Sequence, residues 1–160
     1  MSRFAAALLC FVLAAGAGAI AQKKAPEGPA VRFQNAPELT TPPGYSHAVI
    51  VEHGKIVFIA GQVGLNKEGQ MVGTNDFRAQ AAQALTNLKA VLAAAGAKPE
   101  NIIKLNYYVV GLSRDKLTAL RELRDQMIDK AHPPASTLVG VQALFREEAQ
   151  VEIEAVAVIP

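Results

Sequence analysis

The sharpest change from hydrophobic to polar positions lies within residues 55–66. An uncharged run of β-branched and aromatic side chains, residues 56–59, stops abruptly at Ala60-Gly61-Gln62. This pattern predicts a buried strand that ends at a site, because glycine lets backbone amides approach a ligand and an amide side chain both donates and accepts hydrogen bonds. An ordinary strand end with a turn glycine would give the same pattern.

Hydrophobic periodicity predicts further strands along the rest of the chain. Alternating positions or short apolar runs occur at residues 31–33, 48–52, 102–110, 135–141 and 150–159. The strand at 48–52 is separated from the strand at 55–60 by His53-Gly54, which is typical of a tight turn. We therefore expect these two strands to form a hairpin.

Two segments have the spacing of amphipathic helices. Apolar residues recur every three or four positions from Phe77 to Ala95, after a predicted N-cap at Thr74 or Asn75 and before a stop at Gly96. A second helix is predicted at residues 115–130, with a buried stripe at Leu117, Leu120, Leu123, Met127 and Ile128. The remaining polar positions are predicted to be solvated: Arg78, Gln83, Asn87, Lys89, Arg121, Glu122, Arg124 and Asp125.

The order of these elements predicts one α+β domain over residues 44–160, with two helices packed on one face of a mixed β-sheet. Residues 22–43 are rich in proline and polar residues, which predicts a flexible linker that becomes a short edge strand at 31–33. The sheet face away from the helices, with Tyr108, Val156 and Val158, would be an exposed apolar patch in a monomer. We therefore expect a closed homo-oligomer with sites between subunits.

The first 21 residues have the pattern of a cleaved signal peptide. A basic residue, Arg3, precedes an apolar stretch at 4–13, and Ala19-Ile20-Ala21 forms a small-x-small cleavage site before Gln22. This pattern predicts a periplasmic or secreted protein with no membrane span after cleavage. The sequence has one cysteine, Cys10, within this segment, so no disulfide is expected in the mature protein.

Charge and composition exclude several classes of function. The formal net charge is +2 and the basic residues are dispersed, which argues against binding to nucleic acid or to a membrane surface. His47, His53 and His132 lack the spacing of a metal site, so we predict no metal and no other cofactor. Glu152, on the last strand, would be a partly buried carboxylate, where desolvation favours a role in proton transfer. An ordinary acidic residue on a half-exposed strand is the alternative.

Five separated motifs resemble the reactive intermediate deaminase (RidA/YjgF) family. They lie, in the family's order, at residues 44–49, 58–64, 83–88, 94–97 and 151–157. The resemblance implies a chorismate-mutase-like fold assembled as a homotrimer, with clefts for a small-molecule ligand between subunits. It also implies hydrolysis of enamines, imines or related reactive intermediates.

The resemblance also implies roles for individual residues. In the family's active members, a glutamate in the last strand positions the attacking water, a tyrosine lines the cleft, and an arginine after a Pro-Ala pair clamps the carboxylate of a 2-imino acid. The glutamate matches Glu152, the tyrosine matches Tyr45, and the glycine of the cleft floor matches Gly61. Further substrate-binding candidates beside these residues are Gln62, Ser136 and Thr137.

The family's arginine has no counterpart in this sequence, because Ser136 follows Pro134-Ala135. A serine hydroxyl offers one neutral hydrogen bond where a guanidinium grips a carboxylate with two, so substrates that carry a carboxylate are expected to bind poorly. Ala60 likewise stands where the family usually has a serine. Two functions remain open: a deaminase-type hydrolase that uses Glu152, or a non-catalytic small-ligand-binding or holdase-like module that has lost the reaction.

Overall fold

The computed structural model describes residues 28–160, so the predicted signal peptide at 1–21 lies outside the described residues and export stays a prediction. A short 3-10 turn spans Pro99–Asn101. None of the helices within residues 28–160 is long and apolar enough to cross a membrane. The elements are β1 (Val31–Gln34), β2 (Ala48–Val51), β3 (Lys55–Val63), α1 (Phe77–Ala94), β4 (Ile102–Val110), α2 (Arg114–Arg124), β5 (Ala135–Val141) and β6 (Val151–Ile159).

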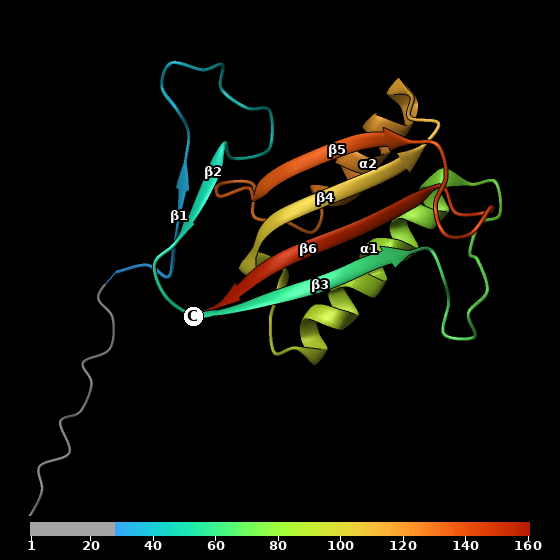
Figure 1. Ribbon diagram of the computed structural model, residues 1–160, viewed down its shortest axis with the longest axis horizontal. Coiled ribbons are helices and arrows are strands. Elements are labelled where there is room, and N and C mark those ends of the chain that lie inside the picture. The colour runs from blue at the N-terminus through green and yellow to red at the C-terminus, as the bar shows by residue number, and fades with distance from the viewer. Residues whose placement is uncertain (1–27) are drawn as a thin grey trace, which may run out of the picture.

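The main sheet is mixed and has the strand order β3-β6-β4-β5. β6 is antiparallel to both of its neighbours, whereas β4 and β5 are parallel and are joined through α2. Figure 1 shows both helices behind this sheet. The predicted α+β architecture, with two helices on a mixed sheet, is therefore confirmed.

The hydrophobic core lies between the sheet and the helices. The alternation predicted for the central strands holds, because every second residue of β4 and β6 is buried on the helix side. Leu85, Leu88 and Leu92 of α1 pack against these strands. The alternating buried residues of β4 and β6 are Ile103, Leu105, Tyr107, Val109, Val151, Ile153, Ala155 and Ala157.

The predicted hairpin between residues 48–52 and 55–60 is wrong. β2 pairs with β1 in a separate two-stranded sheet, and β3 pairs with β6 (Figure 1). The chain enters β3 at Gly54, whose φ of +113° and close approach to the end of β6 leave no room for a side chain. A Cβ at Gly54 would lie 2.6 Å from the Ile159 carbonyl oxygen, so this turn fits β3 against β6 rather than against β2.

Both helices differ from their predicted bounds. The N-cap of α1 is Asp76, whose Oδ1 accepts a hydrogen bond from the Ala79 amide at 3.0 Å, and not Thr74 or Asn75. Asn75 has a φ of +66°, so it belongs to the turn before the cap. α2 ends at Arg124, six residues before the predicted end at 130. The chain continues in turns, from which Met127 and Ile128 still reach the core.

The sheet face away from the helices is uncovered in the single chain. Phe58 is 81% exposed and Ile56 is 52% exposed on it, while Tyr108 and Val156 are half-buried. The expectation that Val158 is exposed is wrong, because this side chain is buried next to the Gly54 turn. The apolar patch is therefore present, with aromatic and β-branched side chains of β3 as its exposed members. The trimer predicted from it stays a prediction.

Candidate functional site

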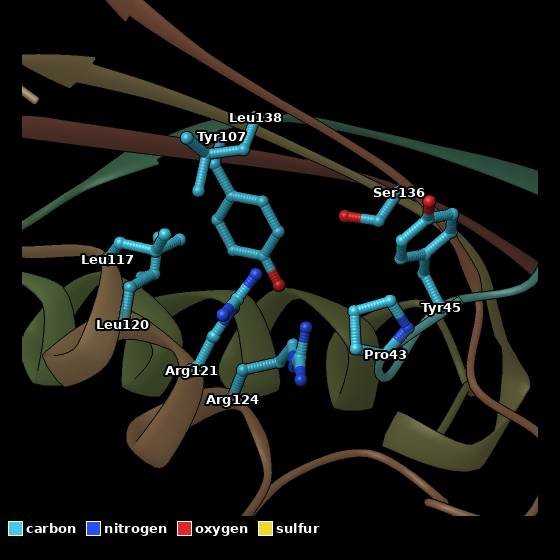
Figure 2. Close-up of a pocket in the computed structure, with 9 residues that line it drawn as sticks. All are labelled: Pro43, Tyr45, Tyr107, Leu117, Leu120, Arg121, Arg124, Ser136 and Leu138. Carbon is cyan, nitrogen blue, oxygen red and sulfur yellow. The ribbon is translucent and has the colours of Figure 1, made fainter. Parts of the chain in front are cut away.

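A cavity of about 250 Å³ lies between α2, the first residues of β5 and the segment before β2 (Figure 2). Both polar and apolar side chains line it. The lining residues are Pro43, Tyr45, Tyr107, Leu117, Leu120, Arg121, Arg124, Ser136 and Leu138. Tyr45 and Ser136, both predicted from the sequence as binding residues, therefore share one cavity.

Strand alternation decides which residues of β5 reach the cavity. Ser136 stands opposite Leu105 of β4, whose side chain is buried under the helices, so Ser136 points to the same side. Thr137 stands opposite Asn106 and points to the open face, where its hydroxyl accepts a hydrogen bond from Lys104 Nζ at 2.6 Å. The structure thus separates Thr137 from Ser136.

The segment that carries Tyr45 is tied to the start of β5. The Ser46 amide donates to the Pro134 carbonyl at 3.1 Å, and the buried Ser46 hydroxyl donates to the Pro133 carbonyl at 2.7 Å. These bonds fix Tyr45 beside Ser136 in spite of their separation in sequence. Figure 2 shows the Tyr45 ring and the Ser136 hydroxyl at the same end of the cavity.

The opposite wall holds two guanidinium groups from α2. Arg124 is only 9% exposed, and its Nε and Nη2 both donate to Asp125 Oδ1, at 2.9 and 2.6 Å. Its guanidinium lies where a side chain of Gly44 would be, because a Cβ at Gly44 would stand 2.7 Å from Arg124 Nη2. Arg121 lies at the surface and turns its guanidinium toward the cavity (Figure 2). The prediction that Arg124 is solvated is therefore wrong.

The hydroxyl of Tyr107 completes this wall. The residue is 2% exposed, and its hydroxyl has no hydrogen-bond partner among residues 28–160. Figure 2 shows the hydroxyl pointing toward the two arginines. Burial raises the pKa of the Tyr107 phenol far above its ordinary value, an effect that Arg124 only partly offsets. The group is therefore a protonated donor, and leaving it unpaired costs about 1 to 3 kcal/mol.

Glu152 and Gly61 form a second group, on the open face of the sheet. Glu152 and Glu154 alternate with the buried residues of β6, and Glu154 accepts hydrogen bonds from Asn106 Nδ2 at 2.6 Å and Tyr108 Oη at 3.0 Å. In contrast, no side chain within residues 28–160 donates a hydrogen bond to the Glu152 carboxylate. That carboxylate lies directly against Gly61, where a Cβ would overlap it.

Gly61 and Gln62 lie within a strand, and not after its end. β3 continues to Val63, and its register with β6 shifts between Ile59 and Gln62. The Gln62 amide turns back on this bulge and donates to the carbonyls of Ala60 and Gly61, at 3.1 and 3.2 Å. The predicted strand end at Ala60 is therefore wrong, and the irregularity that the glycine marks is a bulge.

Asn87 of α1 holds the strand end that follows this bulge. Its Nδ2 donates to the carbonyls of Val63 and Leu65, each at 2.9 Å. The prediction that Asn87 is solvated is wrong, because its side chain satisfies backbone groups where β3 leaves the sheet.

The predicted site residues thus fall into two groups on opposite sides of the main sheet. Tyr45 and Ser136 line the cavity, whereas Gly61, Glu152 and Thr137 lie at the open face. Sequence reasoning missed Arg121, Arg124 and Tyr107. Leu117, Leu120 and Arg124 follow helical spacing, so the buried stripe of α2 already contained a signal for Arg124. No group of three metal-binding side chains comes together within residues 28–160.

Comparisons with known proteins agree with the fold. The family model for Endoribonuclease L-PSP matches residues 33–159. A Dermatophagoides farinae protein named 2-iminobutanoate/2-iminopropanoate deaminase is 36% identical over 115 residues, which cover 72% of this chain and 85% of the relative. A RutC family protein from Aquifex aeolicus is 40% identical over 131 residues, which cover 80% of this chain and 99% of the relative.

A solved structure shows the same arrangement of elements. It is a Yersinia pestis protein of unknown function from the conserved Rid protein family, 40% identical, with a TM-score of 0.73 over 81% of this chain and 99% of that chain. The chain therefore belongs to the Endoribonuclease L-PSP family, which contains the RidA/YjgF proteins that its motifs resemble.

Proposed function

We propose that this protein hydrolyses a small imine or enamine, with Glu152 as the catalytic carboxylate. The observation that carries the proposal is the contact between Glu152 and Gly61. The carboxylate has no hydrogen-bond donor among the described side chains, unlike Glu154 two residues later, and the absence of a side chain at position 61 is what allows it to lie against β3. A carboxylate in this state is free to accept a proton from water.

The reaction balances without a cofactor. Water adds to the imine carbon as Glu152 accepts one of its protons and passes it to the imine nitrogen, which gives a carbinolamine. The carbon–nitrogen bond then breaks as the carbinolamine hydroxyl gives its proton to the leaving nitrogen and becomes the carbonyl oxygen. The products are a carbonyl compound and ammonia. The name of the Dermatophagoides farinae relative, an iminobutanoate and iminopropanoate deaminase, supports this reaction class.

The proposal requires a homotrimer in which sites span subunits. Within one chain, Glu152 and the cavity that contains Tyr45 and Ser136 lie on opposite sides of the main sheet. The exposed apolar side chains of Phe58 and Ile56 lie on the same open face as Glu152. An assembly that buries this face would place Glu152 at a subunit boundary, from which it must reach the cavity of a neighbouring copy.

Ammonia release tests the proposal. The purified protein is incubated with an amino acid oxidase that generates imines, and the rate is compared with that of Glu152→Gln. We expect the substitution to remove the acceleration over buffer, a loss of roughly 100-fold or more. Glu154→Gln is the matched control, because it changes the same group on the same face of β6 at a carboxylate already bonded to Asn106 and Tyr108.

The alternative function gives a different result in the same experiment. A non-catalytic small-ligand-binding or holdase-like module would leave the rate equal to that in buffer, for neutral and anionic imines alike. A clear acceleration that survives Glu152→Gln would contradict the assigned role of Glu152 and leave the reaction class standing.

A further inference from the structure

We propose that Arg121, Arg124 and Tyr107 form a subsite that binds the carboxylate of a small monoanionic ligand. The inference rests on the proposed function, because it assigns the substrate class of the same cavity. The positive charge that binds the carboxylate would then come from helix α2, because Ser136 on strand β5 is neutral.

The cavity wall on α2 carries net positive charge. Oδ1 of Asp125 accepts hydrogen bonds from Nε and Nη2 of Arg124. Nη1 of this guanidinium is therefore left to bind a ligand. Arg121 forms no ion pair or hydrogen bond with another side chain of the described region. Two lining guanidinium groups and the Asp125 carboxylate leave one net positive charge at the wall; Lys130, whose Nζ lies 3.9 Å from Asp125 Oδ2, is exposed and outside the lining. One positive charge matches a carboxylate better than a phosphate dianion.

Tyr107 supplies a hydrogen-bond donor to the same wall, independently of the arginines. The Tyr107 hydroxyl is buried, points into the cavity beside both guanidinium groups and has no partner within residues 28–160 (Figure 2). A buried hydroxyl is normally hydrogen-bonded. A carboxylate oxygen at this wall would accept from the hydroxyl and from a guanidinium together.

The remaining lining sets the size and character of the ligand. The cavity volume of about 250 Å³ is below that of pockets for drug-sized molecules, which start at roughly 300 Å³. Leu117, Leu120 and Leu138 form its apolar part. We therefore expect a short, unbranched or lightly branched aliphatic monocarboxylate.

This subsite reverses the expectation drawn from position 136 alone. Ser136 removes one guanidinium from β5, but its hydroxyl faces a cavity whose charge comes from α2 (Figure 2). Carboxylate ligands are then favoured over neutral analogues. The same cavity can bind an anion without an arginine at position 136.

Equilibrium binding to the Glu152→Gln protein tests the subsite without turnover. The probes are pyruvate, its neutral isostere pyruvamide, and inorganic phosphate, each followed by ligand-observed NMR. Arg121→Gln removes one charge from a surface position that the core does not need. Arg114→Gln is the matched control, because it removes the same charge from the same helix outside the cavity lining.

We expect Arg121→Gln to raise the Kd for pyruvate about tenfold or more, the effect of losing a charge-assisted hydrogen bond. Arg114→Gln should leave this Kd within about twofold, and neither variant should change pyruvamide binding by more than that. Tyr107→Phe should weaken pyruvate binding selectively as well.

Several results would overturn the subsite: no pyruvate binding, equal Kd values for pyruvate and pyruvamide, tighter binding of phosphate than of pyruvate, or no effect of Arg121→Gln. These results are separable from the proposed hydrolysis. Selective pyruvate binding without Glu152-dependent ammonia release would retain the subsite and reject the reaction. Glu152-dependent ammonia release without selective pyruvate binding would retain the reaction and reject the subsite.

Discussion

The Glu152 carboxylate rests against the backbone of Gly61, at the bulge where β3 changes its register with β6. No other side chain of the described residues holds this carboxylate by a hydrogen bond. The position of the proposed catalytic group therefore depends on the absence of a side chain on the neighbouring strand.

Gly61→Ala should lower the rate of imine hydrolysis roughly 10- to 100-fold, because the added Cβ overlaps the Glu152 carboxylate and displaces it. The atoms met are the end of a flexible side chain, so the free energy of unfolding should change by less than about 1 kcal/mol. Gly140→Ala in β5 is the control, since its Cβ would meet only Leu112 and the Val109 carbonyl. A fully active Gly61→Ala enzyme would reject the role of this contact.

If the protein forms the proposed trimer, Phe58→Glu should convert it to monomers, because it places a charge on the apolar open face where the side chain is 81% exposed. Light scattering coupled to gel filtration gives the mass. Phe145→Glu is the matched control, since this phenylalanine is 67% exposed but lies outside the main sheet. A monomeric wild-type protein at micromolar concentration would contradict both the trimer and the shared site.

Asn87→Ala should reduce the free energy of unfolding by about 1 to 3 kcal/mol, because the carbonyls of Val63 and Leu65 lose their side-chain donor. Urea denaturation measures the loss. Lys89→Ala, at an exposed position of the same helix, should change stability by less than about 0.5 kcal/mol. Equal stabilities of the two variants would mean that water replaces the Asn87 amide without loss.

Stability should fall at alkaline pH through Tyr108. Its hydrogen bond to Glu154 raises the pKa of the phenol above the ordinary value of 10.0, so the protonated form is favoured in the folded protein. The stabilising effect is complete below pH 10.0 and is lost as the pH rises through the raised pKa. Denaturation of wild type and Tyr108→Phe across this range should show a stability difference that shrinks with rising pH. A constant difference would exclude the linkage.

Local patterns predicted most of the fold. The alternation in β4 and β6 and the helical spacing of α1 each indicate which side chains face the core. This information is contained in a few neighbouring residues of the sequence. Strand pairing is not local, so β2 was assigned to the wrong partner. Its true partner, β1, coincides with the short edge strand predicted at residues 31–33, but no local pattern reported which strand it would pair with.

The site was harder to predict, because its residues meet through tertiary contacts. The motifs identified Tyr45, Glu152 and Gly61, yet they gave no sign that the sheet separates Tyr45 from Glu152. Arg124 looked like part of a charged surface, since its neighbours in sequence are charged. Its burial depends on Asp125 and on the space left at Gly44, which no local pattern reports.

The placement of β6 has a consequence for synthesis. This strand lies between β3 and β4, yet it follows every other strand of the main sheet along the chain. During translation, β3 emerges with no partner in the main sheet until β6 leaves the ribosome, nearly a full domain later. Until β6 is synthesised, the apolar strand at 55–63 must therefore be kept from aggregating. A transport system that accepts only unfolded chains could act at any time before β6 is synthesised.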